Sequence, residues 1–277
     1  MIKQLEEKNY LDKMKKEQLF KFEDLYYIAE EIVKEKGLGN YVTKIVSGCE
    51  PAYYAHQKKI SLNTNLNSYW VSTFEDELCF KRKAPVNYYN LLLLYSLMHE
   101  LRHAEQKKII VEDYEKYGKY FLRNMIMGTV RNYYYPDDHD KLYTEYDAFV
   151  DPMFELNKLD IDELMILNRN IANRIYYAYL DYDNKTIKCP IEISEEVTSQ
   201  LWNRLYSESQ MAGEPENSMY FKAYDAYEYA NMCKRERFMN IEDKLKIGDV
   251  VDNINIVDDI YKGKIRTKNI INELKRR

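Results

Sequence analysis

Residues 87–106 have the sequence NYYNLLLLYSLMHELRHAEQ, which combines a long apolar run with two histidines four positions apart. Apolar residues recur at the spacing of one helix face, and the stretch contains neither glycine nor proline. Asn87 follows Pro85 and is a favourable residue at the start of a helix. We therefore predict a helix from residue 87 to about residue 111, with the histidines in its second half.

The histidines belong to the pentapeptide H-E-L-R-H at residues 99–103. Residues four apart lie on one face of a helix, so His99 and His103 can both bind one zinc ion. Glu100 stands beside them, and we expect it on the exposed side of the helix, where its carboxylate can reach a water on the metal. The alternative is that two histidines cover a helix face without binding any metal.

The two sides of this helix differ in chemistry. One side carries the residues that we expect to be buried, Leu91, Leu94, Leu97, Met98 and Leu101. The other carries Ser96, His99, His103 and Gln106. Arg102 points away from the expected metal, and we predict that it pairs with an acid.

A catalytic zinc needs a third protein ligand and an open position for water. Glu145 is the first candidate, because Ala148, one turn later, would let a helix over residues 144–156 pack closely on the histidine helix. An acid in a first helical turn is also favoured by the helix dipole without any metal. The alternative ligands, in order of preference, are Asp147, His139 and Asp151.

The sequence H-E-L-R-H-A-E-Q at residues 99–106, followed by E-Y-D-A at 145–148, resembles the zincin superfamily of metallopeptidases. Within it, the chain is similar to bacterial and phage HExxH proteins of the ImmA/IrrE-like group over residues 20–157. The metzincin subclass is excluded, since it requires glycine and histidine where this chain has Gln106 and Ile109. The resemblance implies a zinc peptidase with Glu100 as general base and with the metal ligands His99, His103 and Glu145.

The rest of the chain predicts an α+β fold that is mostly α-helical. A helix over residues 22–33 ends at Gly37 and Gly39, and short strands follow at 41–47, 52–56 and 59–63. The resemblance implies that residues 59–63 form an edge strand that holds the substrate. We expect residues 1–157 to form a zincin-like unit with a small sheet beside the HExxH helix, and residues 158–277 to add C-terminal helices of unknown role.

Composition limits the partners and the location. The net charge of −5 argues against nucleic acid as the main partner, and we interpret the basic residues 262–277 as a solvated helix face and tail. The four cysteines lack C-x-x-C spacing, the first residues lack a secretory signal, and the longest apolar run is too short to span a membrane. We expect a cytoplasmic protein without a membrane partner; its oligomeric state is left open.

The leading functional hypothesis is hydrolysis of peptide bonds in a peptide or protein substrate by a zinc-activated water. The alternative is a zinc-binding regulatory or interaction protein with a non-catalytic zincin fold, although a non-catalytic site would not need Glu100. A nucleic-acid module built on the basic C-terminus is a third hypothesis. An oxyanion stabiliser is also required, and its candidates are Tyr133, Tyr134, Tyr135, Tyr143 and His139.

Overall fold

The computed structural model describes residues 5, 10–55, 57–65, 85–113, 121–122, 143–156, 158–159, 161, 163–164, 166–168 and 170–171. Its elements are α2 (Tyr10–Lys15), α3 (Phe22–Glu35), β1 (Lys44–Ser47), β2 (Ala52–Tyr54), β3 (Lys59–Leu62), α5 (Val86–Glu112) and α7 (Tyr143–Leu156). Helix outweighs strand in this part of the chain, as the sequence predicts. Residues 172–277 lie outside the described residues, so the expected C-terminal helices stay a prediction.

The chain divides into two compact units. The first comprises Met1–Glu105 and Ala148–Asn173, and the second comprises Gln106–Asp147 and Arg174–Arg277. The first unit contains α2, α3, the sheet, most of α5 and the later part of α7. Of the second unit, the structure describes the last turns of α5, residues 121–122 and the first residues of α7.

Helix α3 packs beside the sheet and ends at a glycine, as predicted. Leu25, Ile28 and Ile32 form its buried face. Gly37 has φ 63°, a left-handed conformation that other residues adopt at a cost, and the Leu38 N–H bonds back to the Val33 carbonyl at 2.7 Å. This turn releases the chain from the helix and leads it toward β1.

The three strands form one sheet in the order β1-β3-β2. Strand β3 is parallel to β1 and antiparallel to β2, with Ile60 opposite both Ile45 and Tyr53. The expectation that residues 59–63 form an edge strand is therefore wrong, because β3 has a neighbour on each side. A substrate strand cannot pair with the main chain of β3.

Strand β3 is buried on both of its faces. Ile60 and Leu62 are buried, and so is Ser61 on the opposite face. Ser61 fits there because Gly48 has no side chain, since a Cβ at residue 48 would come within 2.0 Å of the Ser61 Oγ. Strand β3 is therefore covered on both faces and paired on both edges.

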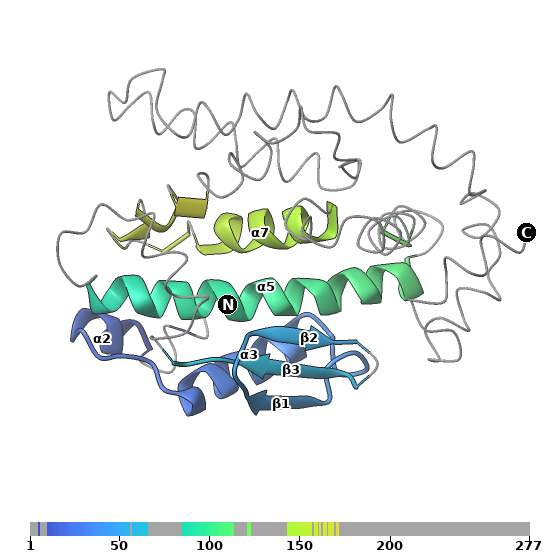
Figure 1. The fold of residues 1–277 in the computed structure, drawn as a ribbon, viewed down its shortest axis with the longest axis horizontal. Helices are drawn as coiled ribbons and strands as arrows, with labels where there is room; N and C mark the ends of the chain where they lie inside the picture. Colours follow the sequence, from blue (N-terminus) through green and yellow to red (C-terminus); the bar gives the residue numbers. More distant parts are fainter. Residues whose placement is uncertain are drawn as a thin grey trace, which may run out of the picture. The chain divides into compact units, whose positions relative to one another are not determined.

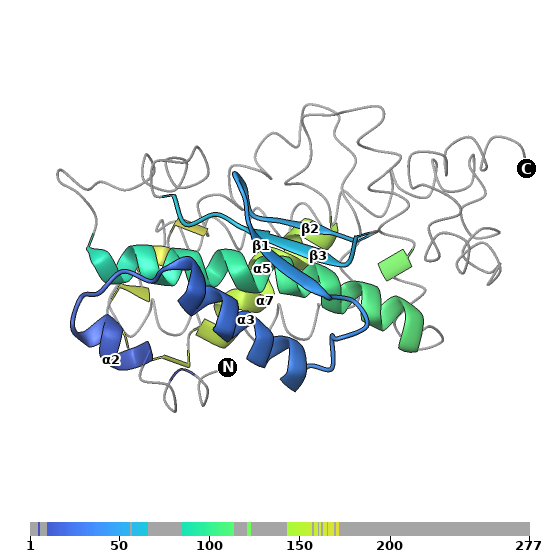
Figure 2. The same cartoon turned by 90° about the horizontal axis from the view of Figure 1, so that it is seen from below.

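Helix α5 begins at Val86, directly after Pro85, and is the core of the first unit. Residues 88–98 are buried at every position, so the helix is covered on nearly all sides. Within this unit, α5 lies between the sheet with α3 on one side and α7 on the other (Figures 1 and 2). The part of α5 that carries His99 therefore has packed neighbours on two sides.

A buried asparagine ties the connection between α2 and α3 to α5. The Asn90 Oδ1 accepts a hydrogen bond from the Phe20 N–H at 2.7 Å, and the Asn90 Nδ2 donates to the Gln18 carbonyl at 2.9 Å. Both ends of the side-chain amide are thus satisfied, as a buried amide requires.

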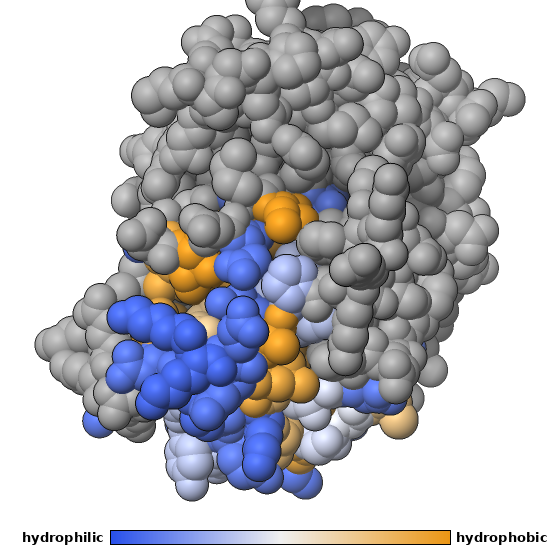
Figure 3. Space-filling model, turned by 90° about the vertical axis from the view of Figure 1, so that its left-hand side faces the viewer, coloured by the Kyte–Doolittle hydropathy of each residue, from blue (hydrophilic) through white to orange (hydrophobic). Residues whose placement is uncertain are grey.

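On the face in Figure 3, hydrophilic residues occupy more of the coloured surface than hydrophobic ones. No helix in the described ranges combines the length and the apolar character needed to cross a membrane.

Candidate metal centre

His99 and His103 lie on one face of α5 with their rings close together. The ring centroids are 4.8 Å apart and the ring planes are nearly perpendicular, at 87°. The Nε2 atoms face each other at 3.2 Å. The helical spacing of four residues therefore brings both imidazole nitrogens to one point in space, as the motif predicts.

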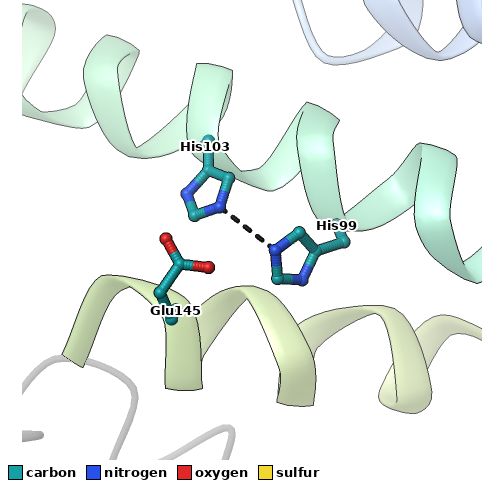
Figure 4. A group of neighbouring side chains, drawn as sticks. All are labelled: His99, His103 and Glu145. Atoms are coloured by element: carbon teal, nitrogen blue, oxygen red, sulfur yellow. Dashed lines mark hydrogen bonds between the residues drawn. The ribbon is translucent and has the colours of Figure 1, made fainter. Parts of the chain in front are cut away.

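Glu145 approaches this point from the first turn of α7. One carboxylate oxygen and one nitrogen of each histidine form a group in which all atoms lie within 4.8 Å of one another. Figure 4 shows the Glu145 side chain pointing from α7 toward the two rings on α5. Glu145 is buried, so it lies beside the histidines and away from bulk water.

This donor set fits a zinc ion. Two nitrogens bound to one tetrahedral zinc at about 2.0–2.1 Å must lie roughly 3.3–3.4 Å from each other. The observed 3.2 Å between His99 Nε2 and His103 Nε2 is close to that separation. Two imidazoles and one carboxylate are also a ligand set that leaves a catalytic zinc one open position.

The structure favours Glu145 over the other candidate ligands. The Asp147 carboxylate accepts a hydrogen bond from the Gln106 Nε2 at 2.8 Å. Asp151 lies 3.6 Å from the Arg102 guanidinium and 4.0 Å from the Lys36 ammonium. Each of these acids is engaged by a side chain outside the histidine pair. His139 lies outside the described residues.

Glu100 follows His99 on α5 and is buried, with an exposed fraction of 8%. The expectation that it lies on the exposed side of the helix is wrong, because the side of α5 that carries Glu100 is covered. Among the described residues, its carboxylate has no hydrogen-bond or ion-pair partner. No lysine of the described part therefore competes for it.

A cluster of ion pairs confirms that Arg102 pairs with acids. The Arg102 guanidinium and the Lys36 ammonium lie 2.9 Å and 2.8 Å from the Glu105 carboxylate. Burial raises the pKa of Glu105, but the neighbouring Arg102 and Lys36 outweigh burial and hold this pKa below its ordinary value. With Asp151 on α7, these residues connect the residue that follows α3 with α5 and α7.

Close contacts also hold α7 on α5 near the histidines. Ala148 is fully buried, consistent with the close helix packing expected of a small side chain. The Phe149 ring lies 4.8 Å from the His99 ring, centroid to centroid, and the Tyr95 hydroxyl donates to the Phe149 carbonyl at 3.0 Å. These two aromatic residues were missed in the sequence, because their positions show no signal apart from helical spacing.

Gln106 is a further residue whose contacts could not be foreseen. It shares the histidine face of α5, as predicted, but it is buried and bonded to α7. The candidate oxyanion stabilisers Tyr133, Tyr134, Tyr135 and His139 lie outside the described residues, and only the main chain of Tyr143 is described.

Comparison of the chain with protein-family models, with curated proteins and with solved structures gives no match. Function must therefore be inferred from the side chains themselves.

Proposed function

We propose that the protein is a zinc-dependent peptidase. The observation that carries this proposal is the convergence of His99, His103 and Glu145, whose ligand atoms lie within 4.8 Å of one another. An imidazole pair at 3.2 Å with a buried carboxylate beside it has the chemistry and spacing of a zinc site. His99, His103 and Glu145 would hold the ion.

Zinc bound there would lower the pKa of a water molecule and polarise a substrate carbonyl. Glu100 supplies the acid–base chemistry of the proposed reaction. Its carboxylate accepts the proton that water loses on attacking the peptide carbon, and then donates a proton to the departing amine nitrogen. The products are a carboxylic acid and an amine, so one water is consumed for each bond cleaved.

The environment of Glu100 supports this role. Among the described residues no cation pairs with its carboxylate, so no ion pair holds it away from a water molecule or an amine nitrogen. Arg102, on the histidine helix itself, and Lys36 are instead paired with Glu105 and Asp151. We infer that this separation keeps Glu100 available for proton transfer.

A second function, a zinc-binding regulatory protein without catalysis, is favoured by one observation. Glu100 is only 8% exposed, so a substrate must reach a largely covered carboxylate. The two functions differ in a simple assay, because a regulatory protein retains its zinc but leaves peptides intact.

The test is a mixed peptide library incubated with the protein and analysed by mass spectrometry. The proposal predicts internal cleavage that is lost after treatment with a zinc chelator and restored by added zinc. Zinc-loaded protein that cleaves no peptide would favour the regulatory function, and protein that binds no zinc would contradict both.

A further inference from the structure

Gln106 makes two hydrogen bonds from α5 to the first turn of α7. It lies three residues after His103 and is only 4% exposed. Its Nε2 donates to the Thr144 carbonyl at 2.8 Å and to the Asp147 Oδ2 at 2.8 Å. A buried amide in this position uses both of its N–H groups on one short segment of the neighbouring helix.

The chemistry of the partners fixes the orientation of this amide. A main-chain carbonyl and a carboxylate are both acceptors, so only the NH₂ end of Gln106 can face them. The bond to Asp147 is charge-assisted and therefore stronger than a bond between neutral groups. Asp147 is itself buried, so losing the amide would leave a carboxylate without this donor in a covered place.

The two acceptors lie on either side of Glu145 in the sequence. Thr144 precedes it and Asp147 follows two residues later, so the bonds hold the same helical turn at two points. Hydrogen bonds at two points restrain the turn against movement along the helix axis and against rotation about that axis. Because Gln106 and His103 belong to the same helix, the restraint acts on the position of Glu145 relative to the histidines.

We infer that Gln106 is a positioning residue that holds Glu145 at the zinc site. Its two bonds go to the residues that flank Glu145, so it acts through the first turn of α7. This inference rests on the zinc site of the proposed function but not on peptide hydrolysis. Residues that orient metal ligands from outside the ligand shell typically contribute about 10–100-fold to metal affinity.

A second buried amide of α5 provides a matched control. Asn90 also makes two hydrogen bonds from α5 to a neighbouring segment, accepting from the Phe20 N–H at 2.7 Å and donating to the Gln18 carbonyl at 2.9 Å. Both bonds go to the connection between α2 and α3, and Asn90 precedes His99 by nine residues. Asn90→Leu therefore removes the same kind of side chain from α5 without releasing the turn that carries Glu145.

The experiment measures zinc affinity by chelator competition and the visible absorption of the cobalt(II)-substituted protein. Gln106→Leu should weaken zinc binding about 10-fold or more and change the cobalt spectrum, which reports the loss of an oxygen ligand. Asn90→Leu should lower the melting temperature but leave both metal readouts unchanged. If Gln106→Leu does not fold, Gln106→Asn, whose side chain is too short to reach both acceptors, takes its place.

Exchanging the donor and the acceptor between Gln106 and Asp147 distinguishes a positioning role of Gln106 from a general packing role. Gln106→Glu sets a carboxylate against Asp147 and should weaken zinc binding. Adding Asp147→Asn supplies an amide donor to the new carboxylate and should recover part of the lost affinity. Asp147→Asn alone should have little effect, because its amide oxygen still accepts from Gln106.

Three outcomes would overturn the inference. The first is wild-type zinc affinity and an unchanged cobalt spectrum in Gln106→Leu. The second is failure of Asp147→Asn to improve zinc binding in the Gln106→Glu background. The third is wild-type protein that binds no zinc, which removes the metal centre as well. Wild-type protein that binds zinc but cleaves no peptide refutes only the peptidase, and the positioning role then stands on the metal readouts.

Discussion

The Nε2 atoms of His99 and His103 lie 3.2 Å apart on adjacent turns of α5. This separation suits two nitrogens bound to one ion, and Glu145 on α7 brings a carboxylate oxygen to the same place. The three residues come from two segments separated by about forty positions. Their convergence is therefore a property of how α7 packs on α5.

Loss of Glu145 should release the metal. Because even the residues that orient metal ligands contribute about 10–100-fold to affinity, Glu145→Ala should weaken zinc binding by at least that factor. Metal content by mass spectrometry and chelator competition measure the effect. Glu155→Ala is the matched control, since this glutamate lies on the same helix and pairs with Lys158 at 2.7 Å. Equal zinc binding by wild type and Glu145→Ala would place the third ligand elsewhere.

The ion pairs of Glu105 with Arg102 and Lys36 should make the free energy of unfolding depend on pH in the acid range. The pKa of Glu105 in the folded protein is lowered by Arg102 and Lys36, so the unfolded chain binds a proton more readily than the folded one. The stabilisation is therefore complete above the ordinary glutamate pKa, about 4.3, and is lost as the pH falls through the lower folded pKa. Denaturant unfolding at several pH values should show that Glu105→Gln weakens this acid dependence. Parallel stability curves for variant and wild type would contradict the assignment.

Replacing Gly37 after α3 should destabilise the protein more than replacing Gly39. The φ of 63° at Gly37 is unfavourable for any residue with a Cβ, so Gly37→Ala should reduce the free energy of unfolding by about 1 kcal/mol. Gly39→Ala is the control, because a Cβ there meets nothing within 4 Å. Urea denaturation measures both. The prediction fails if the two variants lose the same stability.

Local signals in the sequence predicted the helices well. The bounds of α3, α5 and α7 lie close to the expected ones, because Gly37 and Pro85 interrupt helices through the backbone alone. The three strands were also found in the expected places. Short-range chemistry was sufficient for these elements.

The order of the strands could not be predicted in the same way. Pairing depends on residues far apart in the sequence, and the alternation around Ser61 resembles a half-exposed strand. Ser61 is buried because Gly48 leaves room for it, which no local pattern indicates. The same limit explains the unexpected burial of Glu100, since the neighbours that cover α5 come from distant segments.

The candidate site also combines residues that could be predicted from the sequence with residues that could not. The histidine pair follows from helical spacing, so its geometry was predictable. Glu145 was suggested by family resemblance and by the small Ala148, not by spacing. The bonds of Gln106 to α7 could be found only in the structure, since an amide on a helix face has many possible partners.

The measurement that tests the central claim most directly is peptide turnover by Glu100→Gln at equal zinc content. The substitution keeps the size of the side chain and its carbonyl oxygen but removes the basic carboxylate. Since positioned acid–base catalysis contributes about 10²–10⁴-fold, we predict wild-type zinc occupancy and melting temperature with turnover reduced by that factor. A Glu100→Gln protein that binds zinc and cleaves peptides as fast as wild type would contradict the proposed peptidase mechanism.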